Sequence, residues 1–210
     1  MAKLKAPLLS LGASGAIGKS LVFFGWKGLD VVREYVIPSN PQTTKQTTQR
    51  DYVKNCVAAI HATILAVAIK LTLDDKTAYA LKGSTFPTPS TWFNQIVKNW
   101  IDVKVKVKKP CILCSGGMDN PAAADFRPHI YFAAASEDTP DAGTFYLGST
   151  KTAIIASKAA VIAAAEGASL NVAGGFSGLT VGRKYYWWFN ANTADPCEGV
   201  ESGIYGQVTA

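Results

Sequence analysis

The hydrophobic and polar positions of this chain predict a hairpin, then a helical region, then a strand-rich second half. Residues 1–14 combine small and apolar residues with lysines and show no helical period, so we expect an extended arm. Two β-rich runs, 21–26 and 29–36, flank a Lys27-Gly28 pair that is typical of a tight turn. Because an isolated hairpin is marginal in water, we expect its aromatic side to cover another element or another subunit.

Residues 43–101 have the spacing of helices. Thr43 or Thr44 can cap the first helix, and a shorter second helix is predicted over 74–81. A third helix over 92–101 has a wide apolar face with two tryptophans, which we interpret as core packing. The apolar stripe of the first helix repeats at alternating intervals of four and three residues and consists of Val53, Val57, Ile60, Ile64, Val67 and Leu71.

Valine and lysine alternate strictly over residues 103–108, which predicts a strand with one face of valines and one face of lysines. The lysine row could contact nucleic acid or an acidic partner. Such a row is more often a solvated edge that blocks unwanted strand pairing, and we favour this second interpretation.

Beyond residue 110 the pattern consists of short β-rich runs separated by glycine, aspartate and proline. The runs are 129–134, 143–147, 153–162, 169–176, 184–189 and 204–208. Their spacing predicts a β-sandwich, although the alanine-rich run over 153–165 could form a helix by propensity. We therefore expect an α+β protein with two domains. Residues 1–105 would form the arm, hairpin and helices, and residues 106–210 an all-β sandwich.

The C-terminal part of the chain carries a more specific pattern. Leu179, Gly182 and Tyr185 fit the L-x-x-G-x-x-Y pattern of fibronectin type III domains, and the aromatic run up to Ala191 continues as that family does. The second half therefore resembles an immunoglobulin-like or fibronectin type III module. The resemblance implies that Tyr185 forms a tyrosine corner. It also implies a binding or spacer role, because this fold brings no chemistry of its own.

Charge is distributed unevenly along the 210 residues. The net charge is +6, yet residues 1–110 carry sixteen basic against six acidic residues, and residues 111–210 carry five against nine. This split suggests a basic half that faces something acidic; the alternative is that lysines keep an apolar chain soluble. With 48% hydrophobic residues and no long uncharged run, we expect a folded protein made in the cytoplasm, without a secretory signal or a membrane span.

Residues that could carry catalysis are few. Residues 13–20 fit the loose form of a phosphate-binding loop, with Lys19 and Ser20 at the phosphate and magnesium positions. The β-rich run that follows is not the helix that such a site requires, so we expect no nucleotide site. His61 and His129 lie beside no nucleophile motif, and we predict no catalytic residue and no cofactor.

Cys111 and Cys114 have the spacing of half a zinc site or of a redox pair. A zinc ion would need two more ligands, and only Cys197 or His129 could come from the same half. A thioredoxin-type pair opens a helix, whereas this pair precedes a Ser-Gly-Gly run. We therefore expect no metal and an ordinary pair of thiols in a loop or strand; whether they are joined as a disulfide stays open.

Residues 15–50 combine a glycine-rich start, a Trp-Lys-Gly hairpin and a Pro-x-Asn-Pro-x-Thr helix entry that ends in Gln-Arg. Together with residues 73–79 and 90–94, this run resembles uncharacterised proteins encoded by tailed bacteriophages and prophages, over about residues 15–101. The resemblance implies a role in the virion or in its assembly, and no enzymatic activity.

Our first hypothesis is therefore a non-enzymatic bacteriophage virion structural protein: a capsid decoration, neck or tail component. It would assemble with copies of itself and with other virion proteins through its arm and hairpin, without a cofactor, nucleic acid or membrane. The expected contact residues of the hairpin are Phe23, Phe24, Trp26, Val31 and Tyr35.

Two alternatives belong to other classes of protein. One is a host-surface or glycan-binding protein whose sandwich uses Tyr186, Trp187 and Trp188, although strand alternation would send about half of these side chains into the core. The other is a nucleotide- or nucleic-acid-binding protein that uses Lys19 and the basic half. We do not favour the latter.

Overall fold

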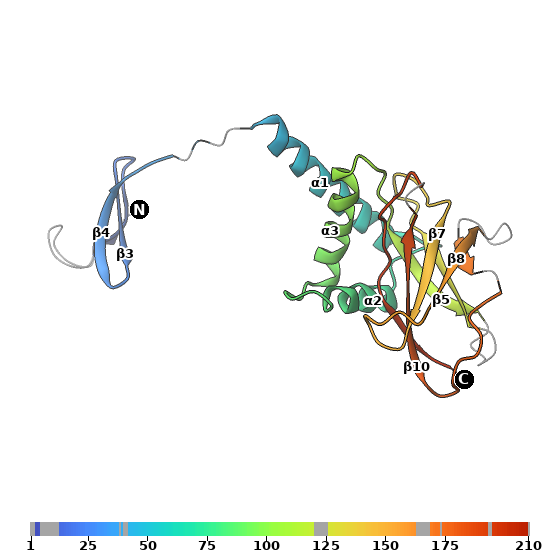
Figure 1. The fold of residues 1–210 in the computed structure, drawn as a ribbon. Coiled ribbons are helices and arrows are strands. Elements are labelled where there is room, and N and C mark those ends of the chain that lie inside the picture. The colour runs from blue at the N-terminus through green and yellow to red at the C-terminus, as the bar shows by residue number, and fades with distance from the viewer. Residues whose placement is uncertain are drawn as a thin grey trace. The chain divides into compact units, whose positions relative to one another are not determined.

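The structure, a computed structural model, describes residues 3–4, 13–37, 39, 42–119, 126–162, 169–172, 174–192 and 195–209. The chain forms two compact units, residues 1–43 and residues 44–210. The first is a small sheet, and the second combines helices with a larger sheet (Figure 1). The protein is therefore α+β, as predicted. The domain boundary that we expected after residue 105 lies inside the second unit.

The first unit is an antiparallel sheet whose strands follow one another in sequence order. Its strands are β1 (Lys3–Leu4), β2 (Ala13–Ile17), β3 (Leu21–Trp26) and β4 (Leu29–Glu34). The predicted hairpin is confirmed, because β3 and β4 pair over their full length. Lys27 and Gly28 between them have φ angles of 50° and 81°, and two positive φ angles are what the tight hairpin turns that match strand twist require.

Three helices begin the second unit: α1 (Thr44–Leu65), α2 (Leu73–Gly83) and α3 (Trp92–Val105). Thr72 and Thr91 cap α2 and α3, and each accepts a hydrogen bond from a backbone N–H in the first turn. The predicted stripe of α1 is only partly correct. Ile60 is buried, but Val53 is 40% exposed, and Val67 lies beyond the end of the helix. Among the described residues, no helix is long and apolar enough to cross a membrane.

The predicted strand over 103–108 is wrong, because α3 continues to Val105 and a turn follows. Ile96, Trp100 and Val103 are all buried at helical spacing, whereas Val105 is exposed. Because one face of α3 is buried in the core, residues 103–105 of the valine–lysine run are helical.

An antiparallel seven-stranded sheet forms the rest of the second unit, in the order β11-β10-β7-β8-β9-β6-β5. Its strands are β5 (Leu113–Asp119), β6 (Arg127–Phe132), β7 (Gly143–Gly148), β8 (Ala156–Ile162), β9 (Ser169–Val172), β10 (Lys184–Ala191) and β11 (Tyr205–Val208). The strands from β6 to β11 match the predicted runs, including the alanine-rich β8. β5 was not predicted, because a bulge between Cys114 and Gly117 interrupts its alternation.

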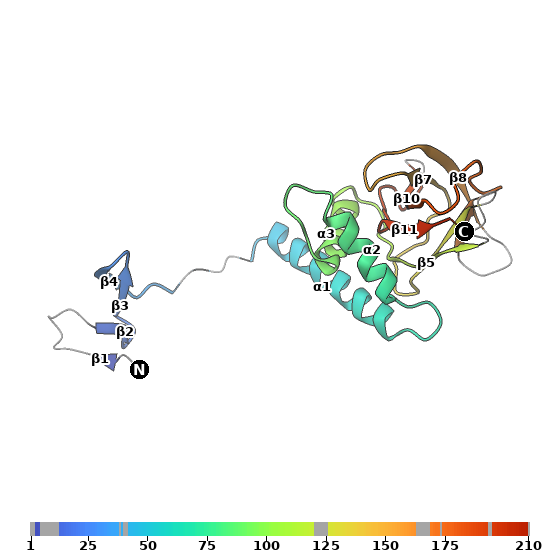
Figure 2. The ribbon, with the colours of Figure 1, turned by 90° about the horizontal axis from the view of Figure 1, so that it is seen from below.

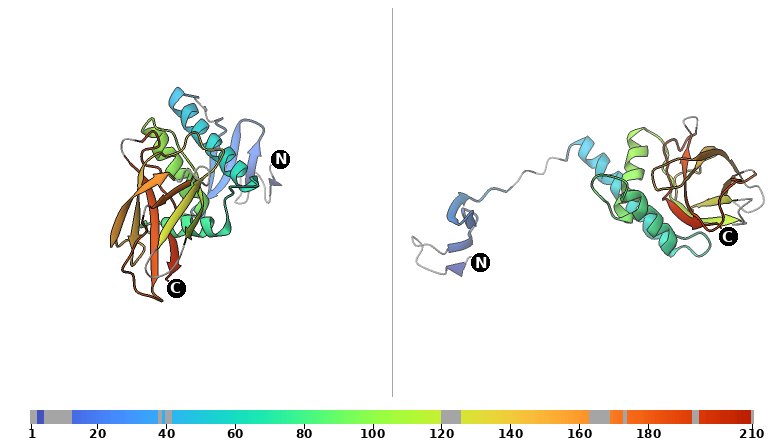
Figure 3. Two further views of the ribbon diagram at one scale, coloured as in Figure 1. Left: turned by 90° about the vertical axis from the view of Figure 1, so that its right-hand side faces the viewer. Right: turned by 60° about the horizontal axis from the view of Figure 1, so that its bottom comes forward.

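The seven-stranded sheet curls until its two ends meet (Figure 3). A Cβ atom on Gly116 of β5 would lie 2.4 Å from the ring of Tyr205 in β11, so the end strands touch where only glycine fits. Both end strands contact α2, and the three helices lie together on one side of the sheet (Figure 2). Ala78 of α2 and Val103 of α3 belong to the same buried core as the inward side chains of the strands.

Candidate functional site

The sheet of the first unit exposes large apolar side chains on both of its faces. On one face Trp26 is 60% and Leu29 is 69% exposed; on the other face Leu21 is 41% and Val32 is 50% exposed. A small sheet without a covering layer is marginal in water, and clustered exposed apolar residues mark interaction sites. The first unit therefore presents an apolar surface on each side.

The cross-strand register assigns each side chain of this sheet to a face. The aromatic face consists of Val22, Phe24, Trp26, Leu29, Val31 and Arg33. The register positions of the aliphatic face include Ile17, Leu21, Phe23, Asp30, Val32 and Glu34. Of the predicted contact residues, Phe24, Trp26 and Val31 therefore share the aromatic face. Phe23 lies on the opposite face, and Tyr35 follows β4 and is exposed.

Arg33 extends over the aromatic face. Its guanidinium carbon lies 5.3 Å from the centroid of the Phe24 ring, within the range of a cation–π interaction. Arg33 and its neighbour Glu34 were not among the predicted contact residues of the hairpin. The strict alternation of β4 was the signal that could have placed these two charges on opposite faces.

The run that resembles a phosphate-binding loop is part of the same small sheet. Residues 13–17 form β2, residues 18–20 form a turn, and β3 follows directly. The Ser20 hydroxyl donates a hydrogen bond to the carbonyl oxygen of Ile17 at 3.1 Å, which closes the turn. A phosphate-binding loop leads into a helix whose N-terminus faces the phosphate. The expectation that no helix follows this run is confirmed.

The aromatic run of β10 divides between the core and the surface. Trp187 is buried and stacks on Tyr205, with ring centroids 4.4 Å apart. The prediction that Trp187 contacts a ligand at the surface is therefore wrong, because strand alternation directs it inward. Tyr186 and Trp188 point outward and are partly exposed. Trp188 stacks on Tyr146 of β7, with ring centroids 5.7 Å apart.

Tyr146, Tyr186 and Trp188 form an outward aromatic cluster on neighbouring strands. The residues opposite them on the flanking strands are small: Ser157 of β8 lies across from Tyr146, and Gly206 of β11 lies across from Tyr186. Tyr146 was not among the predicted surface residues. The alternation of β7, in which Tyr146 is the outward residue between two buried ones, was the available signal.

Ion pairs join lysines of α2, of α3 and of the segment directly after α3 to carboxylates of the strand-rich half. The pairs are Lys82–Glu201, Lys104–Glu137, Lys108–Glu198 and Lys109–Asp138. The predicted lysine row over 103–108 is thus not the edge of a strand, and two of its three lysines, Lys104 and Lys108, have carboxylate partners, as does the neighbouring Lys109. For these lysines, the acidic partner that the uneven charge suggested lies within the same chain.

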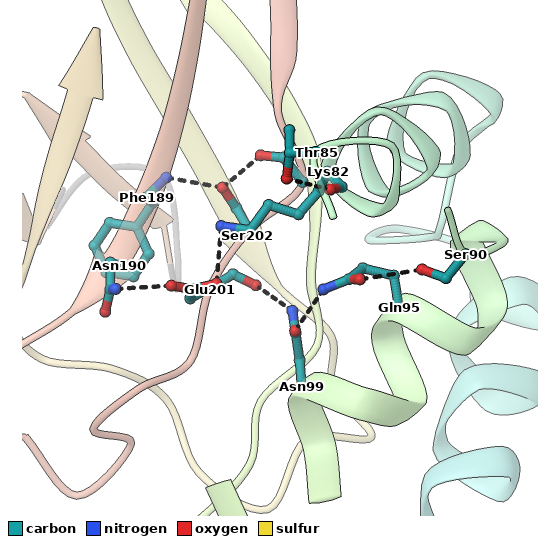
Figure 4. Close-up of polar contacts among 10 residues, drawn as sticks. Lys82, Thr85, Ser90, Gln95, Asn99, Phe189, Asn190, Glu201 and Ser202 are labelled. Carbon is teal, nitrogen blue, oxygen red and sulfur yellow. Dashed lines mark hydrogen bonds and ion pairs between the residues drawn. The ribbon is translucent and has the colours of Figure 1, made fainter. Parts of the chain in front are cut away.

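Glu201 is the centre of a polar network that links α2 and α3 to the sheet (Figure 4). Its carboxylate lies 2.8 Å from Lys82 Nζ and accepts a hydrogen bond from Asn190 Nδ2 at 3.0 Å. Its backbone carbonyl accepts a hydrogen bond from Asn99 Nδ2 at 3.2 Å, and the buried Gln95 donates to Asn99 Oδ1 at 2.9 Å. The polar groups of this network bind one another, so the network stabilises the packing of the helices on the strands.

Asp75, in the first turn of α2, is a fully buried carboxylate. It accepts hydrogen bonds from the N–H groups of Thr72, Ser115 and Gly116 at 2.8, 2.9 and 3.2 Å, and from the Tyr205 hydroxyl at 2.7 Å. Burial, and then the Asp75 carboxylate, raise the pKa of Tyr205 well above its usual value. With its acceptor positions filled by the protein, Asp75 fits a structural role rather than a catalytic one.

The four cysteines are free thiols. Burial raises the pKa values of Cys56, Cys114 and Cys197 from 9.0 to about 12, and it also raises the pKa of Cys111. Such thiols stay protonated at neutral pH and are weak nucleophiles and weak metal ligands. Within the described part of the chain, no group of three or more histidine, cysteine or acidic residues could hold a metal ion.

A cavity of about 370 Å³ opens between α2 and the two end strands of the large sheet. Its polar lining includes Asp74, Thr77, Lys184 and Gln207. Asp74 and Lys184 are both exposed, and no histidine or cysteine is among the described residues that line the cavity. The cavity therefore has no nucleophile held by a general base, and we assign no reaction to it.

No protein-family model, no curated protein and no solved structure matches this chain. Its function is therefore argued from its own residues and from their arrangement.

Proposed function

We propose that this chain is a non-enzymatic structural protein of a tailed-bacteriophage particle, and that it assembles through the sheet that contains the hairpin. Within the particle, the protein would be a capsid decoration, neck or tail component. The observation that carries the proposal is the exposure of apolar side chains on both faces of this sheet, including Trp26, Leu29 and Val32. Other chains that cover these faces would supply the burial that the unit lacks by itself.

The resemblance of residues 15–101 to phage and prophage proteins supports the same role, since the resembling run includes the hairpin. The proposed partners are copies of the chain and other virion proteins, and the proposed location is the virion after synthesis in the host cytoplasm. No cofactor or membrane enters the proposal. Nucleic acid is not a proposed partner, because the ion pairs of Lys104, Lys108 and Lys109 occupy the most basic run.

A finer proposal concerns residues 106–210, which we take to be an immunoglobulin-like or fibronectin type III-like module. The order of neighbouring strands supports it, with β5-β6-β9 on one side of β8 and β7-β10-β11 on the other. An immunoglobulin-like sandwich groups its first, second and fifth strands, and its third, sixth and seventh, in this way. The N–H of Thr180 donates to the Tyr185 hydroxyl oxygen at 3.1 Å, which fits a tyrosine corner. The module would be displayed by the particle.

Quantitative mass spectrometry of gradient-purified particles from the source tests the virion role. We expect the protein in a fixed ratio to the major capsid or tail protein. Absence from particles, with the protein abundant in the lysate, would overturn the proposal.

The contact surface is tested by Trp26→Ala, with Trp188→Ala as the matched control on the other unit. We expect Trp26→Ala to reduce incorporation into particles, because it removes the largest exposed side chain of the aromatic face. Trp188→Ala should leave incorporation intact. Equal incorporation of both variants would show that the aromatic face is not the contact surface.

The outward aromatic cluster supports a second candidate function, which is binding of host-surface glycans. Tyr146, Tyr186 and Trp188 present flat rings beside small residues, and sugar rings pack on such surfaces. The test is binding of the full chain to immobilised host-cell glycans. Trp188→Ala should abolish this binding, whereas Trp26→Ala should leave it unchanged. The candidate fails if the wild-type chain does not bind.

A further inference from the structure

The two faces of the first unit's sheet carry opposite charges. Arg33 lies on the aromatic face and Glu34 on the aliphatic face, because neighbouring residues of a strand point to opposite sides. Both residues are exposed. Across the strand pair, Arg33 lies opposite Val22 and Glu34 lies opposite Leu21, so each charge is set among apolar side chains on its own face.

This arrangement distinguishes between two ways of stacking the sheet on a second copy. When two copies stack with the same ends of β4 together, two aromatic faces bring Arg33 of one copy toward Arg33 of the other, and two aliphatic faces do the same for Glu34. An aromatic face placed on an aliphatic face brings Arg33 of one copy toward Glu34 of the next. Unlike charges at a desolvated interface select a partner, and like charges there oppose association.

We infer that the occupant of each face is a second copy of this chain, stacked head to tail, with its aromatic face on the aliphatic face of the next copy. This inference rests on the proposed structural role and specifies its geometry. Each copy uses two different surfaces, so the contact is heterologous. Such contacts close into a ring or continue as a filament, whereas a two-fold dimer would leave one apolar face of each copy uncovered.

The test is a charge exchange in the full-length chain, read by sedimentation velocity. In Arg33→Glu, both faces carry a carboxylate; in Glu34→Arg, both faces carry a guanidinium. Either variant alone should lose its assembled fraction by about tenfold or more. The chain that carries both substitutions again has opposite charges on its two faces and should assemble as the wild type does. Lys19→Glu, in the turn before β3, makes the same change of net charge as Arg33→Glu and is the control for that variant.

Mixing the two single variants gives a sharper result. The carboxylate of Arg33→Glu on the aromatic face faces the guanidinium of Glu34→Arg on the aliphatic face, and the reverse contact keeps the wild-type pair. We expect the mixture to assemble although neither variant does so alone. Assembly of either single variant alone, or failure of both the mixture and the double variant while the wild type assembles, would overturn the head-to-tail geometry.

Failure of the structural role gives a different result. If the role fails, the wild-type chain is absent from particles and sediments as a monomer, and the charge variants do not differ from it. If only the geometry fails, the wild type assembles and Trp26→Ala still reduces assembly, but exchange of the charges does not restore it. The two failures are therefore separate observations.

Discussion

The hydroxyl of Tyr205 donates a hydrogen bond to the carboxylate of Asp75 at 2.7 Å, across 130 positions of the sequence. Both residues are buried, and the contact joins the last strand of the sheet to the first turn of α2. The Asp75 carboxylate also accepts hydrogen bonds from the backbone N–H groups of Ser115 and Gly116, in the bulge of β5. One carboxylate thus fixes a helix start and both ends of the curled sheet.

The first prediction concerns the donor. Tyr205→Phe keeps the ring that stacks on Trp187 and removes only the hydroxyl. We expect the free energy of unfolding to fall by about 1.5–3 kcal/mol, because a hydrogen bond to a buried charged group is lost. Tyr186→Phe, on the outward side of β10, is the control and should cost less than about 0.5 kcal/mol. Equal denaturant midpoints for both variants would contradict the role of the contact.

The second prediction concerns the acceptor. Asp75→Asn places an amide N–H₂ among donors that need an acceptor, so we expect a loss of about 3 kcal/mol or more in urea unfolding. Asp74→Asn is the matched control, since Asp74 is exposed one residue earlier in the same turn. If the two substitutions cost the same, the buried network does not hold α2 to the sheet.

The third prediction separates two adjacent tryptophans. Trp187→Ala should cost about 3–5 kcal/mol, because it opens a cavity in the core between the strands. Trp188→Ala should cost about 1 kcal/mol or less, since its ring lies on the outward side and is partly exposed. The measurement is the thermal or denaturant midpoint of each variant. A larger loss for Trp188→Ala would reverse the assigned orientation of β10.

The fourth prediction concerns alkaline pH. In the unfolded chain the thiols ionise near their ordinary value of 9.0, whereas the folded protein keeps Cys56, Cys114 and Cys197 protonated up to about 12. The folded state therefore binds more protons above pH 9.0, and its stability is complete below that value and falls as the pH rises. Each such thiol adds up to about 1.4 kcal/mol per pH unit to the slope. Buried Tyr79 and Tyr205 act in the same direction at higher pH.

Urea unfolding at about pH 8 and about pH 10.5 measures this slope. A Cys197→Ala variant removes one titrating group and should flatten the dependence, whatever its stability at neutral pH. Equal unfolding free energies of the wild type at the two pH values would contradict the burial of the thiols.

Much of the fold follows from local patterns. Alternation locates β10, and the paired β-rich runs around Lys27-Gly28 locate the hairpin, because both signals depend only on neighbouring residues. Two predictions failed because of contacts between distant parts of the chain: the strand expected over 103–108 and the absence of a predicted strand at β5. The valine–lysine alternation suggests a strand, but burial of Val103 keeps the backbone helical, and the bulge around Ser115 hides β5.

The contacts of the candidate sites depend on long-range partners that local patterns do not identify. The uneven charge indicated an acidic neighbour, but only the fold shows that Lys108 meets Glu198. The two faces of the hairpin could have been assigned from strand alternation. Their exposure could not, because it depends on which other elements cover them.

The shared core of helices and strands limits how this chain can be inherited in pieces. A recombination event that joined only residues 106–210 to another gene would remove Ala78 and Val103 from the wall of that core. It would also separate Glu201 from Lys82 and Glu137 from Lys104. The smallest segment of this part that recombination could transfer without dividing its core is therefore residues 44–210. Residues 1–43, with the hairpin sheet, form a separate unit that could be exchanged independently.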